Sequence, residues 1–174
     1  MNKKVKKSLP LVIGILIFVV ILLFRPIERV KFSDGSMAPG FNQDKTAIVD
    51  GIIYKFTGIK KGDVVSHYAV NNSDIFTTVS RIIAIPGETI MIKDGNVYVN
   101  NAQLKEAYVN GSTQIIDPDV ISEGKNYTLK EDEYFVLDDN RENSSMDSRS
   151  IGFINSRAQL SNKNNFINGK IISF

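Results

Sequence analysis

One uncharged stretch near the N-terminus limits what this chain can fold into. The run LPLVIGILIFVVILLF covers residues 9–24 and contains no charged side chain. A bilayer core takes about 20 apolar residues, with a lower limit near 17, so the run is slightly short. Lysines before it and Arg25 after it can reach the headgroups with their aliphatic stems and make up the missing length. We therefore expect residues 9–25 to form a transmembrane helix.

The positive charge around this run predicts its orientation. Lysines cluster on its N-terminal side, at positions 3, 4, 6 and 7, and positively charged flanks stay in the cytoplasm. Residues 1–8 are then a cytoplasmic tail, and residues 26–174 form an extracytoplasmic domain. No second apolar run of this length follows in the sequence. We therefore expect a single-pass protein of the plasma membrane.

Two other interpretations of the apolar run are less favoured. A cleaved signal peptide would have a basic start and a shorter apolar core, followed by a small-x-small cleavage site. Here the run is longer, and it continues into RPIERVKF at residues 25–32, which offers no such site. A buried core helix would show an amphipathic pattern, and none is visible in the run. A retained anchor fits the pattern best.

The charge balance and the scarcity of metal ligands argue against several classes of function. The formal net charge is +2, and the four tail lysines carry +4, which leaves about −2 for the rest of the chain. A nucleic-acid-binding domain would carry its positive charge on the folded part. The chain has no cysteine and a single histidine, His67. We expect no nucleic-acid partner, no disulfide, no metal and no cofactor.

The segment after the apolar run has the pattern of short antiparallel strands. Stretches rich in β-branched residues alternate with turn residues such as Asp94-Gly95 and Pro86-Gly87. One further segment, from Ala107 to Asn126, is polar and reads as a surface insertion, and a short helical turn is expected at 157–160. We predict a mainly β domain, with strand-forming stretches at residues 46–54, 63–70, 74–85, 89–104, 133–139 and 169–174.

Three short motifs follow one another in this domain. The first is SDGSMAP at residues 33–39, with Ser36 at its centre. The second is SRIIAIPG at residues 80–87. The third is DDNRENSSMDSRSIGF at residues 138–153, which gathers arginines, aspartates and serines directly after an apolar strand. Taken alone, the third motif is typical of a solvated loop held by an Arg–Asp pair.

The order and spacing of these motifs behind a charged tail and one anchor resemble type I signal peptidases. The resemblance covers the chain from the anchor to the C-terminus. It implies an open, barrel-like antiparallel β domain with an apolar face against the membrane. It also implies a serine that attacks the peptide bond between a signal peptide and an exported protein, and a lysine that serves as general base. The anchor would hold the serine close to the depth at which that bond emerges.

Transferring the family pattern residue by residue gives one match and two departures at the catalytic positions. Ser36 falls on the nucleophile position, with Met37 and Pro39 matching beside it. The general-base lysine position holds Ser80. In one branch of the family a serine two residues before the nucleophile completes the oxyanion hole, and this position holds Asp34.

Most of the remaining family positions are retained. Arg81 and the Pro-Gly pair match in the second motif. The third motif carries one extra residue, within Ser144–Met146, which leaves the placement of Asp147 open. The supporting residues implied by the resemblance are Met37, Arg81, Asp139, Arg141, Ser144, Asp147 and Arg149.

These departures have chemical consequences. A serine hydroxyl is a weak nucleophile until a neighbouring base takes its proton. A desolvated lysine with a pKa near about 7–8 can do this, whereas the hydroxyl of Ser80 has no basic form near neutral pH. Loss of a general base costs about 10²–10⁴ in rate. Loss of one oxyanion donor costs about 3–4 kcal/mol, and an ionised Asp34 would add repulsion.

Three hypotheses about function follow from the sequence. The favoured one is a non-catalytic family member that binds exported polypeptides at the outer membrane face. It resembles the degenerate homologues that accompany pilus assembly in some Gram-positive bacteria, with pilin subunits as clients and a sortase as partner. The second is an active serine endopeptidase that uses Ser36 with His67 or Asp34 as a non-standard base. The third is an unrelated membrane-anchored β module.

Overall fold

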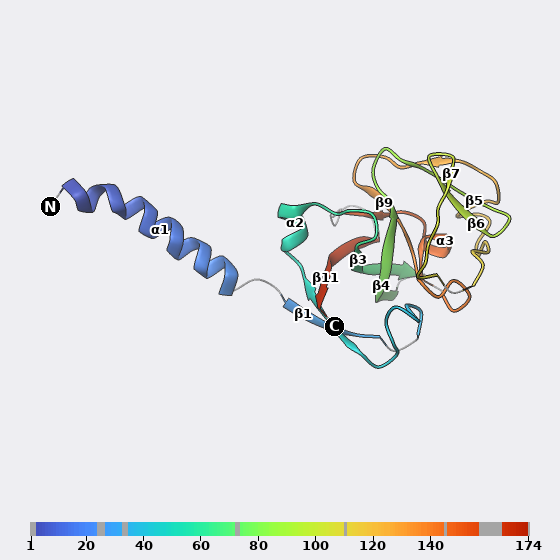
Figure 1. Ribbon diagram of the computed structural model, residues 1–174, viewed down its shortest axis with the longest axis horizontal. Helices are drawn as coiled ribbons and strands as arrows, with labels where there is room; N and C mark the ends of the chain where they lie inside the picture. The colour runs from blue at the N-terminus through green and yellow to red at the C-terminus, as the bar shows by residue number, and fades with distance from the viewer. Residues whose placement is uncertain are drawn as a thin grey trace.

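A computed structural model describes residues 3–23, 27–32, 35–71, 74–109, 111–144, 146–156 and 165–173. Helix α1, Lys3–Leu23, projects away from a β domain that contains the other elements (Figure 1). The side chains from Leu9 to Val20 are all exposed on this helix. None of the described helices meets the combined length and hydropathy criteria for crossing a bilayer. The predicted transmembrane helix is therefore not supported and stays a prediction.

The β domain is built from eleven strands and two short helices among the described residues. In chain order they are β1 Ile27–Lys31, β2 Thr46–Asp50, α2 Ile53–Thr57, β3 Val64–Asn71, β4 Asp74–Ala84, β5 Thr89–Lys93, β6 Asn96–Val99, β7 Ala102–Gln103, β8 Tyr127–Thr128, β9 Glu133–Leu137, α3 Ser148–Ile151, β10 Ile154–Asn155 and β11 Phe166–Ser173. The prediction of a mainly β domain is confirmed.

The larger sheet curls back on itself. Its order is β1-β2-β11-β10-β9-β4-β3, and β3 also pairs with β11. Strands β11, β3, β4, β9 and β10 thus form a closed ring, while β1 and β2 extend it on one side. All pairs in it are antiparallel except β10 with β11. Full closure satisfies backbone groups that an open sheet edge would leave unpaired.

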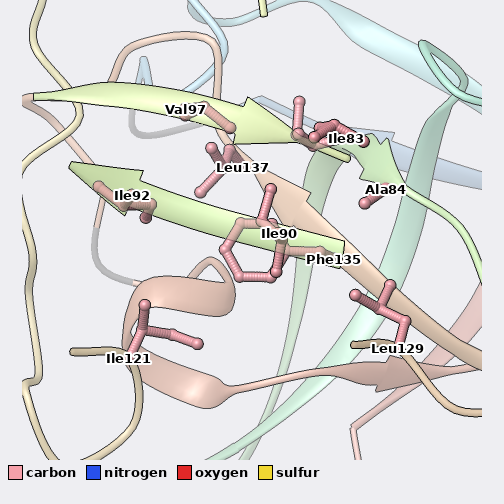
Figure 2. Packing of buried hydrophobic residues seen from close by; sticks show 10 residues of the cluster. Ile83, Ala84, Ile90, Ile92, Val97, Ile121, Leu129, Phe135 and Leu137 are labelled. Carbon is pink, nitrogen blue, oxygen red and sulfur yellow. The ribbon is translucent and has the colours of Figure 1, made fainter. Parts of the chain in front are cut away.

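The smaller sheet, in the order β7-β6-β5-β8, packs on this ring. Figure 2 shows the apolar cluster between the two, with Ile90 and Ile92 of β5 facing Phe135 and Leu137 of β9. The predicted hairpin at β5 and β6 is confirmed. Asp94 and Gly95 form its turn with positive φ angles of 49° and 73°, which the tightest hairpin turns require.

Two expectations for this domain are corrected. The strand predicted at residues 46–54 ends at Asp50, because the Asp50 carboxylate accepts hydrogen bonds from the N–H groups of Ile52 and Ile53 at 2.9 Å and starts α2. The segment 107–126 is not wholly superficial, since Ile121 is 1% exposed and belongs to the cluster of Figure 2. The helical turn expected at 157–160 lies outside the described residues.

Candidate functional site

Ser36 lies in a tight turn at the end of β1 rather than on a strand. The turn is closed by two backbone hydrogen bonds, from Ala38 N–H to the Gly35 carbonyl at 3.1 Å and from Phe41 N–H to the Met37 carbonyl at 2.9 Å. Met37 is 1% exposed and packs among apolar residues that include Phe41 and Val79. The buried Met37 holds the turn on the sheet. Asp34, the expected oxyanion position, lies outside the described residues.

The turn places Ser36 against strand β4. Ser36 is buried and lines a small cavity of about 40 Å³ together with residues 30–32 at the end of β1 and Thr77, Thr78 and Val79 of β4. Strand β4 continues directly into Ser80. The structure therefore brings the first motif to the start of the second, although 44 positions separate Ser36 from Ser80 in the sequence.

The Ser80 hydroxyl is fully buried and is held between two side chains. It donates a hydrogen bond to Asp138 Oδ1 at 2.5 Å and lies 3.0 Å from His67 Nε2. A serine hydroxyl has a single proton to donate, and in this bond it points to Asp138. The contact with His67 is then a bond that the Nε2–H group donates to Ser80. The Ser80 hydroxyl thus accepts one hydrogen bond and donates one, and its only proton is engaged by Asp138.

His67 lies beside Ser80 on the neighbouring strand. In the β3–β4 register His67 pairs with Thr78 and Val65 pairs with Ser80, which puts both polar side chains on one face. Burial lowers the pKa of His67 from its ordinary value to about 4, so the ring is neutral at pH 7. With Nε2 carrying the proton, the available lone pair is on Nδ1, which is buried without a partner among the described residues. This arrangement does not favour His67 as a general base.

The burial of His67 predicts a specific pH dependence of stability. The unfolded chain protonates His67 near its ordinary pKa of 6.5, whereas the folded protein does so only near 4. Between these values the unfolded state binds more protons, so stability falls as the pH drops through this window. We expect a loss on the order of 3 kcal/mol from His67. Urea unfolding at pH 7 and pH 4.5 should therefore show a larger stability difference for the unmodified protein than for His67→Gln. The same loss of stability between the two pH values in the unmodified protein and in His67→Gln would contradict this prediction.

Among the described residues, the third motif takes part in three ion pairs with buried carboxylates, one of which joins Arg141 to Glu106 at 2.6 Å. Arg81 of β4 binds Asp139 through Nε and Nη2 at 2.8 and 2.6 Å. Arg149 binds Asp147 through Nε at 3.0 Å and Nη2 at 2.7 Å, with both side chains at most 1% exposed. Asp147 also caps helix α3 by accepting from the Arg149 N–H. The Arg–Asp pairing expected for this motif is present, but the solvated loop is not, because the paired carboxylates are buried.

Comparison with known proteins agrees with this arrangement. A family model described as "Signal peptidase, peptidase S26" matches residues 5–168. The chain belongs to this signal peptidase family. Signal peptidase IB of Staphylococcus aureus is 33% identical over 130 residues, which cover 68% of this chain and 66% of the relative. The chain thus spans just under two thirds of that relative's length.

Two further signal peptidases are similar to the chain. A probable signal peptidase I-1 of Synechocystis is 28% identical over 156 residues, covering 86% of this chain and 76% of the relative. A crystal structure of a signal peptidase I from Enterococcus faecalis has 26% identity and a TM-score of 0.42, covering 56% of this chain and 89% of that one.

The extra residue of the third motif does not interrupt the hydrogen bonds to Asp147. The Ser144 hydroxyl donates to Asp147 Oδ2 at 2.8 Å, and the Asp138 N–H donates to the same oxygen at 3.3 Å. Ser145, within the extra stretch, lies outside the described residues. The insertion therefore does not separate Ser144 from Asp147.

Sequence reasoning missed two contributors to this site. Asp138 holds the Ser80 hydroxyl, and Glu106 accepts hydrogen bonds from Tyr108 and Arg141. Asp138 could have been found from the sequence, because it belongs to an acidic pair, Asp138-Asp139, at the end of an apolar strand. Glu106 gave no such signal, since it stands among other polar residues. Among the described residues, no cluster of three histidine or acidic side chains could hold a metal ion.

Proposed function

We propose that this signal peptidase family member binds the signal-peptide region of exported proteins without cleaving it by the family's serine–lysine chemistry. The observation that carries the proposal is Ser80 at the lysine position, with its hydroxyl committed to Asp138 and His67. Neither Ser80 nor a His67 ring with its pKa near 4 supplies a base at neutral pH. The fold, the Ser36 turn and the buried supporting pairs are nonetheless retained.

We place the protein at the outer face of the plasma membrane, as a further part of this proposal. Helix α1 exposes apolar side chains on every side between Leu9 and Val20, and a soluble protein rarely exposes so large an apolar surface. The lysine-rich N-terminal flank orients its start toward the cytoplasm. Residues 9–25 would then be the anchor, and residues 26–174 the extracytoplasmic domain.

The clients follow from the family. Its members named above are signal peptidases, so exported preproteins are the expected class of client for this chain. Ser36 borders a small cavity between the end of β1 and the Thr77–Val79 stretch of β4, and we propose that the client segment approaches this side of the turn. Within this class, a pilus-assembly role with pilin subunits as clients and a sortase as partner is suggested by the degenerate lysine position alone.

A second candidate function is an active serine endopeptidase. Ser36, Met37 and Pro39 are all present, and Ser36 borders the cavity described above. This function needs a base other than Ser80, and Asp34 or His67 would have to supply it. The tautomer and the lowered pKa of His67 do not favour His67 as this base.

A binding measurement tests the proposed function. The full chain in lipid nanodiscs is titrated with a fluorescent signal peptide, and binding is followed by anisotropy. We expect saturable binding that Ser36→Ala leaves unchanged. Thr77→Arg, which puts a long charged side chain at an exposed residue that lines the cavity, should weaken binding by about tenfold or more, the scale of one lost buried contact.

Thr128→Arg is the matched control, because Thr128 is also an exposed strand threonine but lies in the smaller sheet. It should bind as the unmodified protein does. Equal weakening by both arginines, or no saturable binding at all, would contradict the proposed function.

A further inference from the structure

The Arg81 guanidinium is held on several sides. Its Nε and Nη2 bind Asp139, and its Nη1 donates to the Gly62 carbonyl at 2.9 Å. The ring of Tyr108 stacks on the guanidinium with 4.1 Å between the ring centre and the central carbon. The Phe41 ring lies farther away, at 5.9 Å. Arg81 thus joins the polar insertion, through Tyr108, to the buried carboxylate of Asp139.

Tyr108 is itself fixed in orientation. Its hydroxyl donates to Glu106 Oε1 at 2.8 Å, and the same oxygen accepts from Arg141 Nη2 at 2.6 Å. Arg141 also donates to Thr113 Oγ1 at 2.6 Å and to the Asp138 carbonyl at 2.8 Å. Desolvation and the Glu106 carboxylate raise the pKa of Tyr108, so its hydroxyl remains a donor at neutral pH. The insertion is therefore anchored here by side-chain bonds.

Asp139, which Arg81 binds, and the adjacent Asn140 contact the Ser36 turn. The Asn140 N–H donates to the Ser36 carbonyl at 2.8 Å, and the Asn140 side chain donates to the Gly35 carbonyl at 3.2 Å. The Asp139 carboxylate lies so close to Gly40 that a Cβ there would stand 3.0 Å from Oδ2. Displacement of Asp139 or Asn140 would therefore disturb both ends of the turn.

We propose that Tyr108 is a positioning residue for the Ser36 turn. Its ring keeps the Arg81 guanidinium in the orientation that binds Asp139, and Asp139 and Asn140 keep the turn in place. A guanidinium stacked on an aromatic face gains more when it is partly desolvated, as Arg81 is, with a side chain 14% exposed. The proposal concerns the folded protein without a client and does not depend on the proposed function.

Hydrogen exchange of the full chain, without any client, tests this role. The reporters are the amides of Ala38, Phe41 and Asn140, whose bonds close and support the turn. Tyr108→Leu should accelerate their exchange by about tenfold, the scale of one partly desolvated cation–π contact. Tyr108→Phe, which keeps the ring and loses the bond to Glu106, should change it by less than about threefold.

A purely structural role for Tyr108 makes a different prediction. If the ring only fastens the insertion, Tyr108→Leu should accelerate exchange at Thr113, whose amide bonds to the Gly95 carbonyl, and leave the three turn amides unchanged. That result would overturn the proposal. Should Tyr108→Leu not fold, Tyr108→Met repeats the comparison with a more adaptable side chain, and the same two patterns separate the outcomes.

Discussion

A signal-peptide substrate is expected to remain uncut, or to be cut at least about 10²–10⁴-fold more slowly than by a signal peptidase with lysine at the position of Ser80, when each is assayed at equal concentration. The reason is the replacement of the base. Ser80 donates a hydrogen bond to Asp138 and accepts one from His67, and a serine hydroxyl has no basic form near neutral pH that could take the proton of Ser36. Release of the mature product over hours, resolved by mass spectrometry, measures the rate.

Variants at the same positions serve as controls for this result. Ser36→Ala should leave any residual rate unchanged. Ser80→Lys alone should be poorly tolerated, because His67 and Asp138 already occupy the space beyond the Ser80 hydroxyl and overpacking destabilises cores by about 1–3 kcal/mol. Ser80→Lys combined with His67→Ala relieves that crowding and should be more stable than the single variant. The account of the site would be refuted if the unmodified protein cleaved the peptide in a Ser36-dependent way, at a rate close to that of the lysine-bearing signal peptidase.

Removing the charge of Asp147 is expected to produce the largest loss of stability of any single change considered. Asp147 is fully buried and accepts hydrogen bonds from Arg149, from Ser144 and from the Asp138 N–H. Asp147→Asn leaves the buried Arg149 guanidinium without its counter-charge. Breaking a buried ion pair from one side costs about 3–5 kcal/mol. Urea unfolding followed by circular dichroism gives the difference in free energy.

The same substitution at an exposed ion pair is the matched control. Asp44 pairs with Lys31 at 2.9 Å, with both side chains more than half exposed, and exposed pairs contribute about 0–1 kcal/mol. Asp44 has a φ of 70°, a conformation that asparagine also adopts readily, so Asp44→Asn changes charge alone. Equal losses for the two variants would show that the Asp147–Arg149 pair does not stabilise the domain in the way its burial implies.

The strands and hairpins were predictable because their signals are local. Alternation and turn residues located β3, β4, β5 and β6. The end of β2 was not predicted correctly, because it depends on the hydrogen bonds that the Asp50 carboxylate accepts and not on the pattern of apolar residues.

Many of the side-chain contacts in the site join segments that are distant in the sequence. Asp138 reaches Ser80 only because β9 pairs with β4, across 58 positions of sequence. Tyr108 reaches Arg81 only because the insertion folds back over the end of β4. The sequence shows that these residues are polar. It also shows that a serine stands at the position of the general-base lysine, which indicates that the base is missing. It contains no local signal for which partner each residue meets.

The most direct test of the central claim follows binding and cleavage in one sample. The full chain in nanodiscs is placed in excess over a signal peptide labelled at both ends of the cleavage site, so that anisotropy reports binding and loss of energy transfer reports cleavage. The account predicts saturable binding with no loss of energy transfer, and identical traces for Ser36→Ala. Cleavage that follows binding and disappears in Ser36→Ala would contradict it.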